Sequence, residues 1–200
     1  MKKNQIENKT DLIMVMNDWT NHHQTKEWID YCISIGYQYY EIQMLCLPEE
    51  DSGQDDVVNY ALSKGLKINL HSHYAKNNII DSDEQNRKKS ICQLKQTIDL
   101  SARHNLGVVT FHPGRLSSEN ENVQEKWDML LETVGHIAEY AKQKKVHIAI
   151  ENMEKRNNSK PVRVHNTSLV KIIKFYSLRS CNSNSGSFYC FLQSLQQVAL

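Results

Sequence analysis

Two histidines and one glutamate, His71, His112 and Glu151, are the side chains best suited to chemistry, because each directly follows a short apolar run. An apolar run without polar alternation is typical of a strand buried on both faces of a parallel sheet. Pro113 and Gly114 end the middle run, since proline cannot donate to a sheet ladder. The sequence therefore places all three residues at the carboxyl ends of strands, where parallel α/β folds carry their active sites. The three runs are 68–70, in which Asn69 is polar, 108–111 and 148–150.

These three residue types together are suited to holding a divalent metal ion. Neighbouring strands lie about 4.8 Å apart, so side chains at consecutive strand ends can converge on one point. Two imidazoles and a carboxylate suit Zn²⁺, Mn²⁺ or Fe²⁺ and leave positions for water or substrate. Each residue alone has a commoner explanation, a solvated histidine or an ordinary ion pair, but three strand ends in succession favour metal ligation by His71, His112 and Glu151.

Other polar residues near these strand ends are weaker candidates. Tyr74 and Asn77 follow His71 in its loop, and we expect them to contact substrate, with ordinary loop hydrogen bonding as the alternative. Glu41 lies in a predicted strand, where it is either an inward carboxylate at the site or an outward ion-pair partner. We expect His136 to lie on a helix surface, and His147 to be structural because it lies at the start of its strand.

Apolar periodicity predicts alternating strands and helices. A helix that Thr25 caps should end at Gly36, the next helix should begin near Asp55, and Ser118 with Glu121 forms a possible capping box for the last one. Connections this long between strands imply a parallel sheet with right-handed crossovers, either doubly wound or part of an eight-stranded barrel. The sequence contains no glycine-rich phosphate-binding pattern, which argues against the nucleotide-binding versions. The predicted strands are 12–16, 39–44, 66–71, 108–111 and 146–151, and a long helix spans about 83–104.

The carboxyl-terminal fifth of the chain differs in composition. Seven of the 24 basic residues but none of the 23 acidic residues follow Glu154, so residues 1–154 carry a net charge of −6. An acidic body repels a phosphate backbone, so we expect no nucleic-acid partner. The strand–helix rhythm also stops near Asn157. We therefore expect a partial barrel domain over residues 1–157 and an atypical tail over 158–200, from truncation or a reading-frame change; a naturally variable end is the alternative.

Composition also bears on location. No run approaches eighteen apolar residues, so we expect no membrane span, and the polar start of the chain predicts no secretory signal. Five cysteines form no C-x-x-C pair, which favours free thiols in a reducing cytoplasm.

Three segments resemble the xylose isomerase-like barrel superfamily, which contains sugar isomerases, sugar epimerases and the apurinic endonuclease IV family. The segment from His71 to Asn77, HSHYAKN, is similar to a family pattern H-x-x-Y-x-x-N. HPG at His112 looks like a motif of the fourth family strand, and IEN around Glu151 looks like one of the fifth. The resemblance covers about residues 11–157 and implies an incomplete (β/α)₈ TIM barrel of about five β/α units.

The resemblance also implies roles for these residues. In the endonuclease branch the residues matching His71, His112 and Glu151 are metal ligands; in the epimerase branch the matching glutamate binds metal and helps to move a proton. The family's other ligands, typically Asp, His and Glu on strands six to eight, have His165 as their single counterpart in the tail.

The leading functional hypothesis is therefore a divalent-metal-dependent sugar or sugar-phosphate isomerase or epimerase of carbohydrate metabolism, with Glu151 as the catalytic carboxylate. An endonuclease at abasic sites is the alternative, and a non-catalytic remnant is a third. Unpaired strand edges of an open barrel predict self-association.

Overall fold

The computed structural model describes residues 15–16, 26–47, 51–74, 77–118 and 120–151. The chain divides into two compact units, Met1–Val162 and Arg163–Leu200, and all the described residues belong to the first. The predicted cap at Thr25 and the predicted tail over 158–200 lie outside the described residues, so the expected domain boundary near Asn157 stays a prediction.

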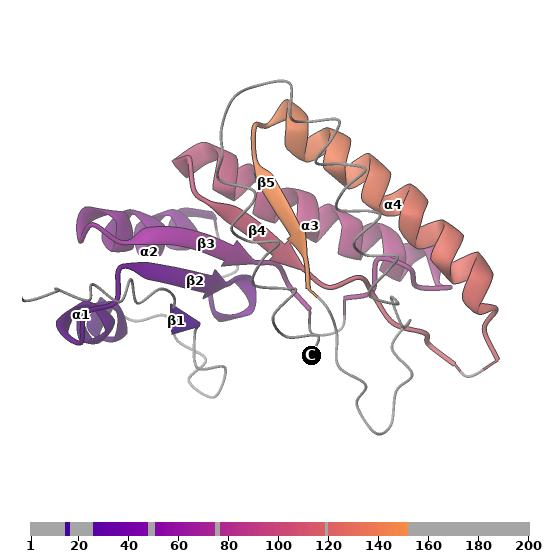
Figure 1. Ribbon diagram of the computed structural model, residues 1–200, viewed down its shortest axis with the longest axis horizontal. Helices are drawn as coiled ribbons and strands as arrows, with labels where there is room; N and C mark the ends of the chain where they lie inside the picture. Colours follow the sequence, from indigo (N-terminus) through magenta and orange to yellow (C-terminus); the bar gives the residue numbers. More distant parts are fainter. Residues whose placement is uncertain (1–14, 17–25, 48–50, 75–76, 119, 152–200) are drawn as a thin grey trace, which may run out of the picture. The chain divides into compact units, whose positions relative to one another are not determined.

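The described residues form one sheet of five parallel strands whose spatial order, β1-β2-β3-β4-β5, equals their order in the chain (Figure 1). Each connection between successive strands therefore advances in the same direction across the sheet. This arrangement confirms the predicted incomplete barrel of about five β/α units. The strands are β1 (Val15–Met16), β2 (Tyr39–Gln43), β3 (Lys67–His71), β4 (Val108–Phe111) and β5 (His147–Ile150).

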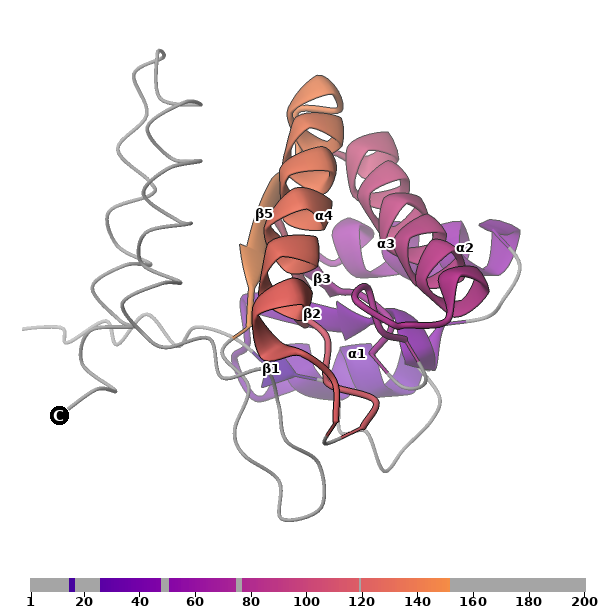
Figure 2. The ribbon, with the colours of Figure 1, turned by 90° about the vertical axis from the view of Figure 1, so that its right-hand side faces the viewer.

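Four α-helices connect the strands, and right-handed crossovers that all advance in one direction place them on one face of the sheet. Figure 2 shows α3 and α4 side by side along this face. None of the helices in the described part of the chain is long and apolar enough to cross a membrane. The helices are α1 (Lys26–Ser34), α2 (Asp51–Ser63), α3 (Glu84–His104) and α4 (Val123–Gln143), with a 3₁₀ turn, η1, at Met44–Cys46.

Alternation along the strands separates an apolar outer face, which packs on the helices, from a polar inner face. Successive strand side chains point to opposite faces, and the outward residues of β2, β3 and β4 are fully or almost fully buried against the helices. Burying one such side chain contributes about 1.5–3 kcal/mol. The apolar core on this face includes Tyr40, Ile42, Ile68, Leu70, Val109, Phe111, Leu94, Ile98, Leu130, Val134 and Ile137.

Two helix starts differ from the sequence predictions and one agrees. The predicted start of the long helix near residue 83 agrees with α3, which Asp83 caps: its carboxylate accepts from the backbone N–H groups of Gln85 (2.8 Å) and Asn86 (3.3 Å). Helix α2 begins at Asp51, four residues before the predicted start at Asp55. The predicted capping box at Ser118 was wrong.

Helix α4 is instead capped by Asn122, whose side-chain oxygen accepts from the N–H groups of Gln124 (2.9 Å) and Glu125 (3.3 Å). Glu121 still accepts from the Ser118 N–H at 3.3 Å, so this half of the motif forms without starting the helix there. Asn122 takes the cap because it directly precedes Val123, the first residue of the helix.

Candidate metal centre

The structure brings the three predicted strand-end residues together at one point. Oε2 of Glu151 lies 2.9 Å from Nε2 of His71 and 2.8 Å from Nε2 of His112. Each residue offers one donor atom, and the three donor atoms all lie within 4.8 Å of one another. Two imidazole nitrogens and one carboxylate oxygen from three successive strand ends therefore share one small volume.

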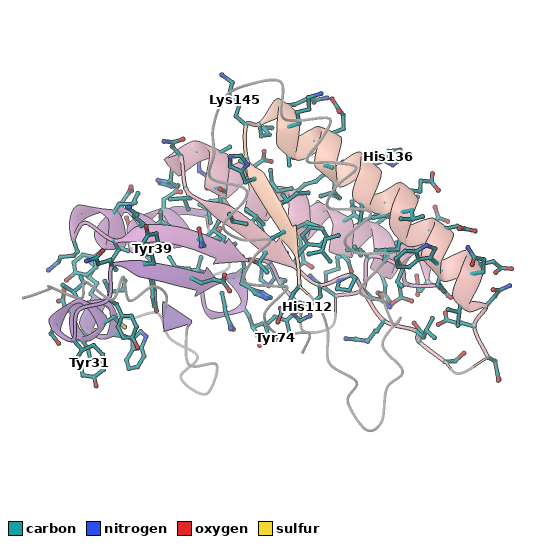
Figure 3. The ribbon with its side chains drawn as sticks, viewed as in Figure 1. Tyr31, Tyr39, Tyr74, His112, His136 and Lys145 are labelled. Carbon is teal, nitrogen blue, oxygen red and sulfur yellow. The ribbon has the colours of Figure 1, made fainter. Side chains whose placement is uncertain are left out.

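Strand register explains this convergence. His71 is paired with Thr110, and Phe111 is paired with Ile150, so His112 and Glu151 take the next positions on their strands. A backbone hydrogen bond of 2.9 Å from the Glu151 N–H to the Phe111 carbonyl continues the ladder to the site. Figure 3 shows His112 at the tips of the strands.

The His71 ring is held in one orientation by its own backbone neighbour. Its Nδ1 lies 3.0 Å from the carbonyl oxygen of Ser72, and a carbonyl only accepts, so Nδ1 carries a hydrogen and donates it. The other ring nitrogen, Nε2, faces Glu151. A histidine whose Nδ1–H is bound to a backbone carbonyl presents Nε2 as its ligand atom, an arrangement common among metal-binding histidines.

Burial differs across the three residues. The side chain of His71 is 3 % exposed, that of His112 is 21 % exposed and that of Glu151 is 44 % exposed. The centre thus has a buried side at β3 and an open side at β5, which solvent or a ligand can reach.

The charges of these residues are coupled. Hydrogen bonds from His112 and then His71 hold the pKa of the Glu151 carboxyl far below its usual range, against the opposing effect of burial. Burial alone would lower the pKa of His71, but the contacts with Glu151, the Ser72 carbonyl and the charge of Glu41 outweigh it, so the pKa is raised. Glu151 is therefore ionised at neutral pH, as a metal ligand must be.

Tyr74 packs against both histidines. Its ring stacks on His112 with 5.1 Å between centroids, and it meets the His71 ring edge-on at 5.5 Å. The side-chain amide of Asn77 donates to the His73 carbonyl at 3.2 Å. The proposed contact of Tyr74 and Asn77 with substrate stays a prediction; the structure places Tyr74 directly on the histidine pair and engages Asn77 with its own loop.

The sequence left the direction of Glu41 open, and the structure places it inward. Oγ1 of Thr110 donates to the Glu41 carboxylate at 3.4 Å, and the Glu41 residue is only 6 % exposed. Burial raises the pKa of this carboxyl, and the charge of His71 partly opposes the rise. Gln43, two residues on, is equally buried, and its Oε1 has no hydrogen-bond partner within the described part of the chain.

Among the other histidines of the described segments, His73 lies two residues after His71 in the same loop, and the remaining three lie away from the centre. His136 is exposed on α4, and His147 is exposed at the start of β5, as expected from their positions in the sequence. His104 bonds the Asp55 carboxylate at 2.6 Å and joins the end of α3 to α2.

Comparison with known sequences identifies the family. The sequence matches the xylose isomerase-like TIM barrel family over residues 29–176, which is most of the chain. The chain belongs to this family. A search of curated proteins by sequence finds no match.

Solved structures of this TIM-barrel type share its fold. A D-tagatose 3-epimerase-like protein superimposes with a TM-score of 0.66 at 19 % identity, covering 80 % of this chain and 59 % of the other. An L-ribulose 3-epimerase gives 0.65 at 14 % identity, with coverages of 82 % and 57 %. The IOLI protein, in a structure with a bound zinc atom, gives 0.64 at 18 % identity, with coverages of 82 % and 59 %. The chain thus spans about three-fifths of the length of these solved structures.

The donor set of this barrel fits a divalent metal ion. Metal–ligand distances of about 2.0–2.2 Å place neighbouring donor atoms about 3.0–3.5 Å apart. The two contacts to Glu151 Oε2 are 2.9 and 2.8 Å, so small side-chain rotations give the required separation. The ring orientation of His71, the ionised Glu151 and the open side at β5 all suit ligation.

Sequence reasoning missed one residue that shapes this site. Asn78, at 2 % exposure, bonds the backbone of the loop that follows His112. The sequence signal was only a second asparagine directly after Asn77, because the partner of Asn78 at Arg115 is 37 residues away.

Proposed function

We propose that this protein is a divalent-metal-dependent isomerase or epimerase of a sugar or sugar phosphate. The observation that carries the proposal is the convergence of His71, His112 and Glu151, with donor atoms within 4.8 Å, at the carboxyl end of a partial barrel. The D-tagatose 3-epimerase-like protein and the L-ribulose 3-epimerase have a similar fold, which supports this substrate class.

In this proposal the three residues hold a Zn²⁺, Mn²⁺ or Fe²⁺ ion. Support comes from the donor chemistry and from two similar structures, the IOLI protein with zinc and a Mycobacterium smegmatis protein in complex with magnesium (TM-score 0.55, 14 % identity, covering 76 % of this chain and 52 % of the other). A bound divalent ion supplies a Lewis acid that polarises a carbonyl or hydroxyl of the substrate.

The protein's own groups supply orientation and proton transfer. Glu151 uses Oε2 toward the histidines, and we assign Oε1 the acceptance and return of a proton at the substrate carbon. Its lowered pKa keeps the carboxylate ionised, which is the form that binds a metal ion. In this proposal the ring of Tyr74, which stacks on His112, lies beside the reacting carbon, and Asn77 lies in the same loop as Tyr74.

Two measurements test this proposal. Equilibrium dialysis against Zn²⁺, Mn²⁺ or Co²⁺ should show stoichiometric binding to the wild type and loss of binding in Glu151→Ala. Incubation with ketoses in D₂O, followed by NMR, should show solvent deuterium incorporated at the carbon next to the carbonyl. Glu151→Gln should abolish this exchange. Glu139→Gln, an exposed position on α4, is the matched control and should behave like the wild type.

Unchanged metal content in Glu151→Ala would sink the ligand assignment. Metal binding without deuterium exchange on any ketose would remove the isomerase hypothesis and leave the metal site. Absence of both metal and exchange in a folded protein would support the third candidate, a non-catalytic remnant of an enzyme.

A metal-dependent endonuclease acting at abasic DNA sites is the second candidate. The pairing of His71 with His112 around one carboxylate favours it, because both histidines match the ligand pattern of the endonuclease branch. The acidic character of residues 1–154 opposes it. Cleavage of an abasic duplex, with binding that weakens as salt rises, would reverse the order of the two candidates.

A further inference from the structure

One buried asparagine connects the two loops that carry the site. The side chain of Asn78 bonds both backbone groups of Arg115: its Nδ2 donates to the Arg115 carbonyl at 2.8 Å, and its Oδ1 accepts from the Arg115 N–H at 3.1 Å. The same Oδ1 also accepts from the Ile80 N–H at 3.3 Å. The side chain of Asn78 therefore links the loop after β3 to the loop after β4 by two hydrogen bonds to the backbone of one residue, as a neighbouring strand would.

The backbone at Gly114 packs closely against the side chain of Asn78. Gly114 has a φ of +96°, and a Cβ atom at this position would lie 2.7 Å from Asn78 Oδ1 and 2.7 Å from Ile80 Cγ1. Glycine is required here both for its backbone conformation and for the space. Because Gly114 lies two residues after His112, this fit fixes the course of the chain that leaves the site.

Asn78 is itself anchored to a long helix. Its backbone N–H donates to Ser90 Oγ at 2.9 Å, and Ser90 in turn donates to the Asn86 carbonyl at 2.8 Å within α3. Both polar side chains are almost completely buried. The contact between the loops is thus tied to an element that cannot shift independently of the core.

The ring contacts of the site depend on the same two loops. His112 lies three residues before Arg115, and Tyr74, which stacks on His112, lies four residues before Asn78. The pair of bonds between Asn78 and Arg115, called the clamp below, therefore joins the loop that carries Tyr74 to the loop that carries His112.

We propose that Asn78 is a positioning residue, which sets the place of His112 relative to His71 and Glu151 and thereby tunes the affinity of the site for a divalent ion. The effect on affinity rests on the proposed metal site; the effect on the position of His112 does not. Outer groups that orient metal ligands typically change metal affinity by about 10- to 100-fold when they are removed.

Two variants of the full chain open the clamp from opposite sides. Asn78→Ala removes the side chain, and Gly114→Ala inserts a methyl group against it. Tyr140→Phe is the first control, because it removes the hydrogen bonds of 2.9 and 2.8 Å to Asp99 between α3 and α4, away from the site. Gly36→Ala is the second, because Gly36 has nearly the same φ of +95° but nothing within 4 Å of an added Cβ.

The probe is Co²⁺, whose visible spectrum reports its ligand geometry. Circular dichroism first establishes that each variant is folded. Asn78→Ala and Gly114→Ala should bind Co²⁺ about 10- to 100-fold more weakly, with an altered spectrum, while both controls keep the wild-type affinity and spectrum. A second readout needs no metal: NMR should show nuclear Overhauser effects between the Tyr74 and His112 rings in the wild type and the controls, and their loss in the two clamp variants.

The outcomes separate this inference from the proposed function. If the wild type binds no Co²⁺, the metal proposal fails, and the ring contacts alone decide whether Asn78 positions His112. If the wild type binds Co²⁺ and both clamp variants bind it equally well with intact ring contacts, the inference is overturned and the metal proposal stands. If one clamp variant fails to fold, the Co²⁺ affinity and ring contacts of the other variant decide between these outcomes.

Discussion

Replacing Lys126 by methionine is expected to destabilise the protein by about 3 kcal/mol. Lys126 lies in the first turn of α4, and its side chain is 7 % exposed. Its ammonium group donates to the Ile80 carbonyl (2.8 Å) and to Ser82 Oγ (2.6 Å) and forms an ion pair of 3.0 Å with Glu121 Oε1. Methionine keeps the apolar stem of the side chain and removes only the charged end.

The magnitude follows from what the substitution leaves behind. Removing one member of a buried ion pair costs about 3–5 kcal/mol, because the other charge stays buried without compensation. Glu121 keeps its contact with Ser82 and two backbone donors, the N–H groups of Ser117 (2.6 Å) and Ser118 (3.3 Å), which places the expected loss at the lower end. For a chain of this length, about 3 kcal/mol lowers the melting temperature by about 6–12 °C.

Urea unfolding followed by circular dichroism measures this loss. The midpoint should fall while the slope of the unfolding free energy against urea stays the same. The double variant Lys126→Met with Glu121→Gln removes both charges. It should be more stable than the sum of the two single losses predicts, with a coupling energy above about 1 kcal/mol.

Lys142→Met is the matched control. Lys142 also lies on α4, but its side chain is 61 % exposed and its Nζ is 3.9 Å from the Glu139 carboxylate. Exposed pairs of this kind contribute about 0–1 kcal/mol, so this substitution should change stability by less than about 0.5 kcal/mol. A loss below about 1 kcal/mol in Lys126→Met would refute the reasoning, since the ion pair would then not be effectively buried.

Three further outcomes are expected. Hydrogen bonding from Ser82 and Lys126 lowers the pKa of Glu121 from 4.5 to about 2 in the folded state, against the opposing effect of burial. The stabilising effect of the Glu121 carboxylate is therefore complete above pH 4.5 and is lost as the pH falls toward 2. Urea unfolding at each pH should show that Glu121→Gln flattens this part of the curve of stability against pH. His112→Ala should weaken Co²⁺ binding at least about tenfold in equilibrium dialysis, whereas His136→Ala on the exposed face of α4 should not. Asp83→Ala should cost about 1 kcal/mol in urea unfolding, because the N-cap of α3 is lost.

The strand ends could be predicted because two local signals agree there. The apolar runs 108–111 and 148–150 identify two of the strands, and His112 and Glu151 directly follow them; in β3, Asn69 interrupts the pattern, and Leu70 directly precedes His71. The right-handed crossover rule then places consecutive strands side by side, which brings His71, His112 and Glu151 to one edge. This argument needs no contact between distant residues, and the positions of the three side chains agree with it.

The start of α2 could not be predicted from the same signals. Its first turn is Asp51-Ser52-Gly53, which is polar and carries no apolar periodicity, so the pattern becomes visible only at Val57 and Val58. The start of α4 was ambiguous for a different reason. Both Ser118 and Asn122 precede a glutamate by three residues, and the structure uses the cap nearest the first apolar residue of the helix, Val123.

The direction of Glu41 required the register of the sheet. Tyr40 and Ile42 alternate with Glu41 and Gln43, which indicates two faces of β2 but does not say which face meets the site. The pairing of Gln43 with His71 in the ladder settles it, because paired residues point to the same side. A buried inward carboxylate follows from this geometry and not from the residue's type or its sequence neighbours.

Residues that position the site depend on contacts between distant parts of the chain. His71, His112 and Glu151 are identified by what directly precedes them, whereas the role of Asn78 arises from a backbone partner 37 residues away. In the sequence alone, Asn78 is one of two adjacent asparagines in a loop, and only Asn77 matches the family pattern. A loop position that must satisfy both backbone groups of another loop needs a short side chain with one donor and one acceptor, and asparagine is the shortest that has both in a fixed plane. For this reason patterns in one sequence indicate candidate ligands better than they indicate the residues that hold those ligands in place.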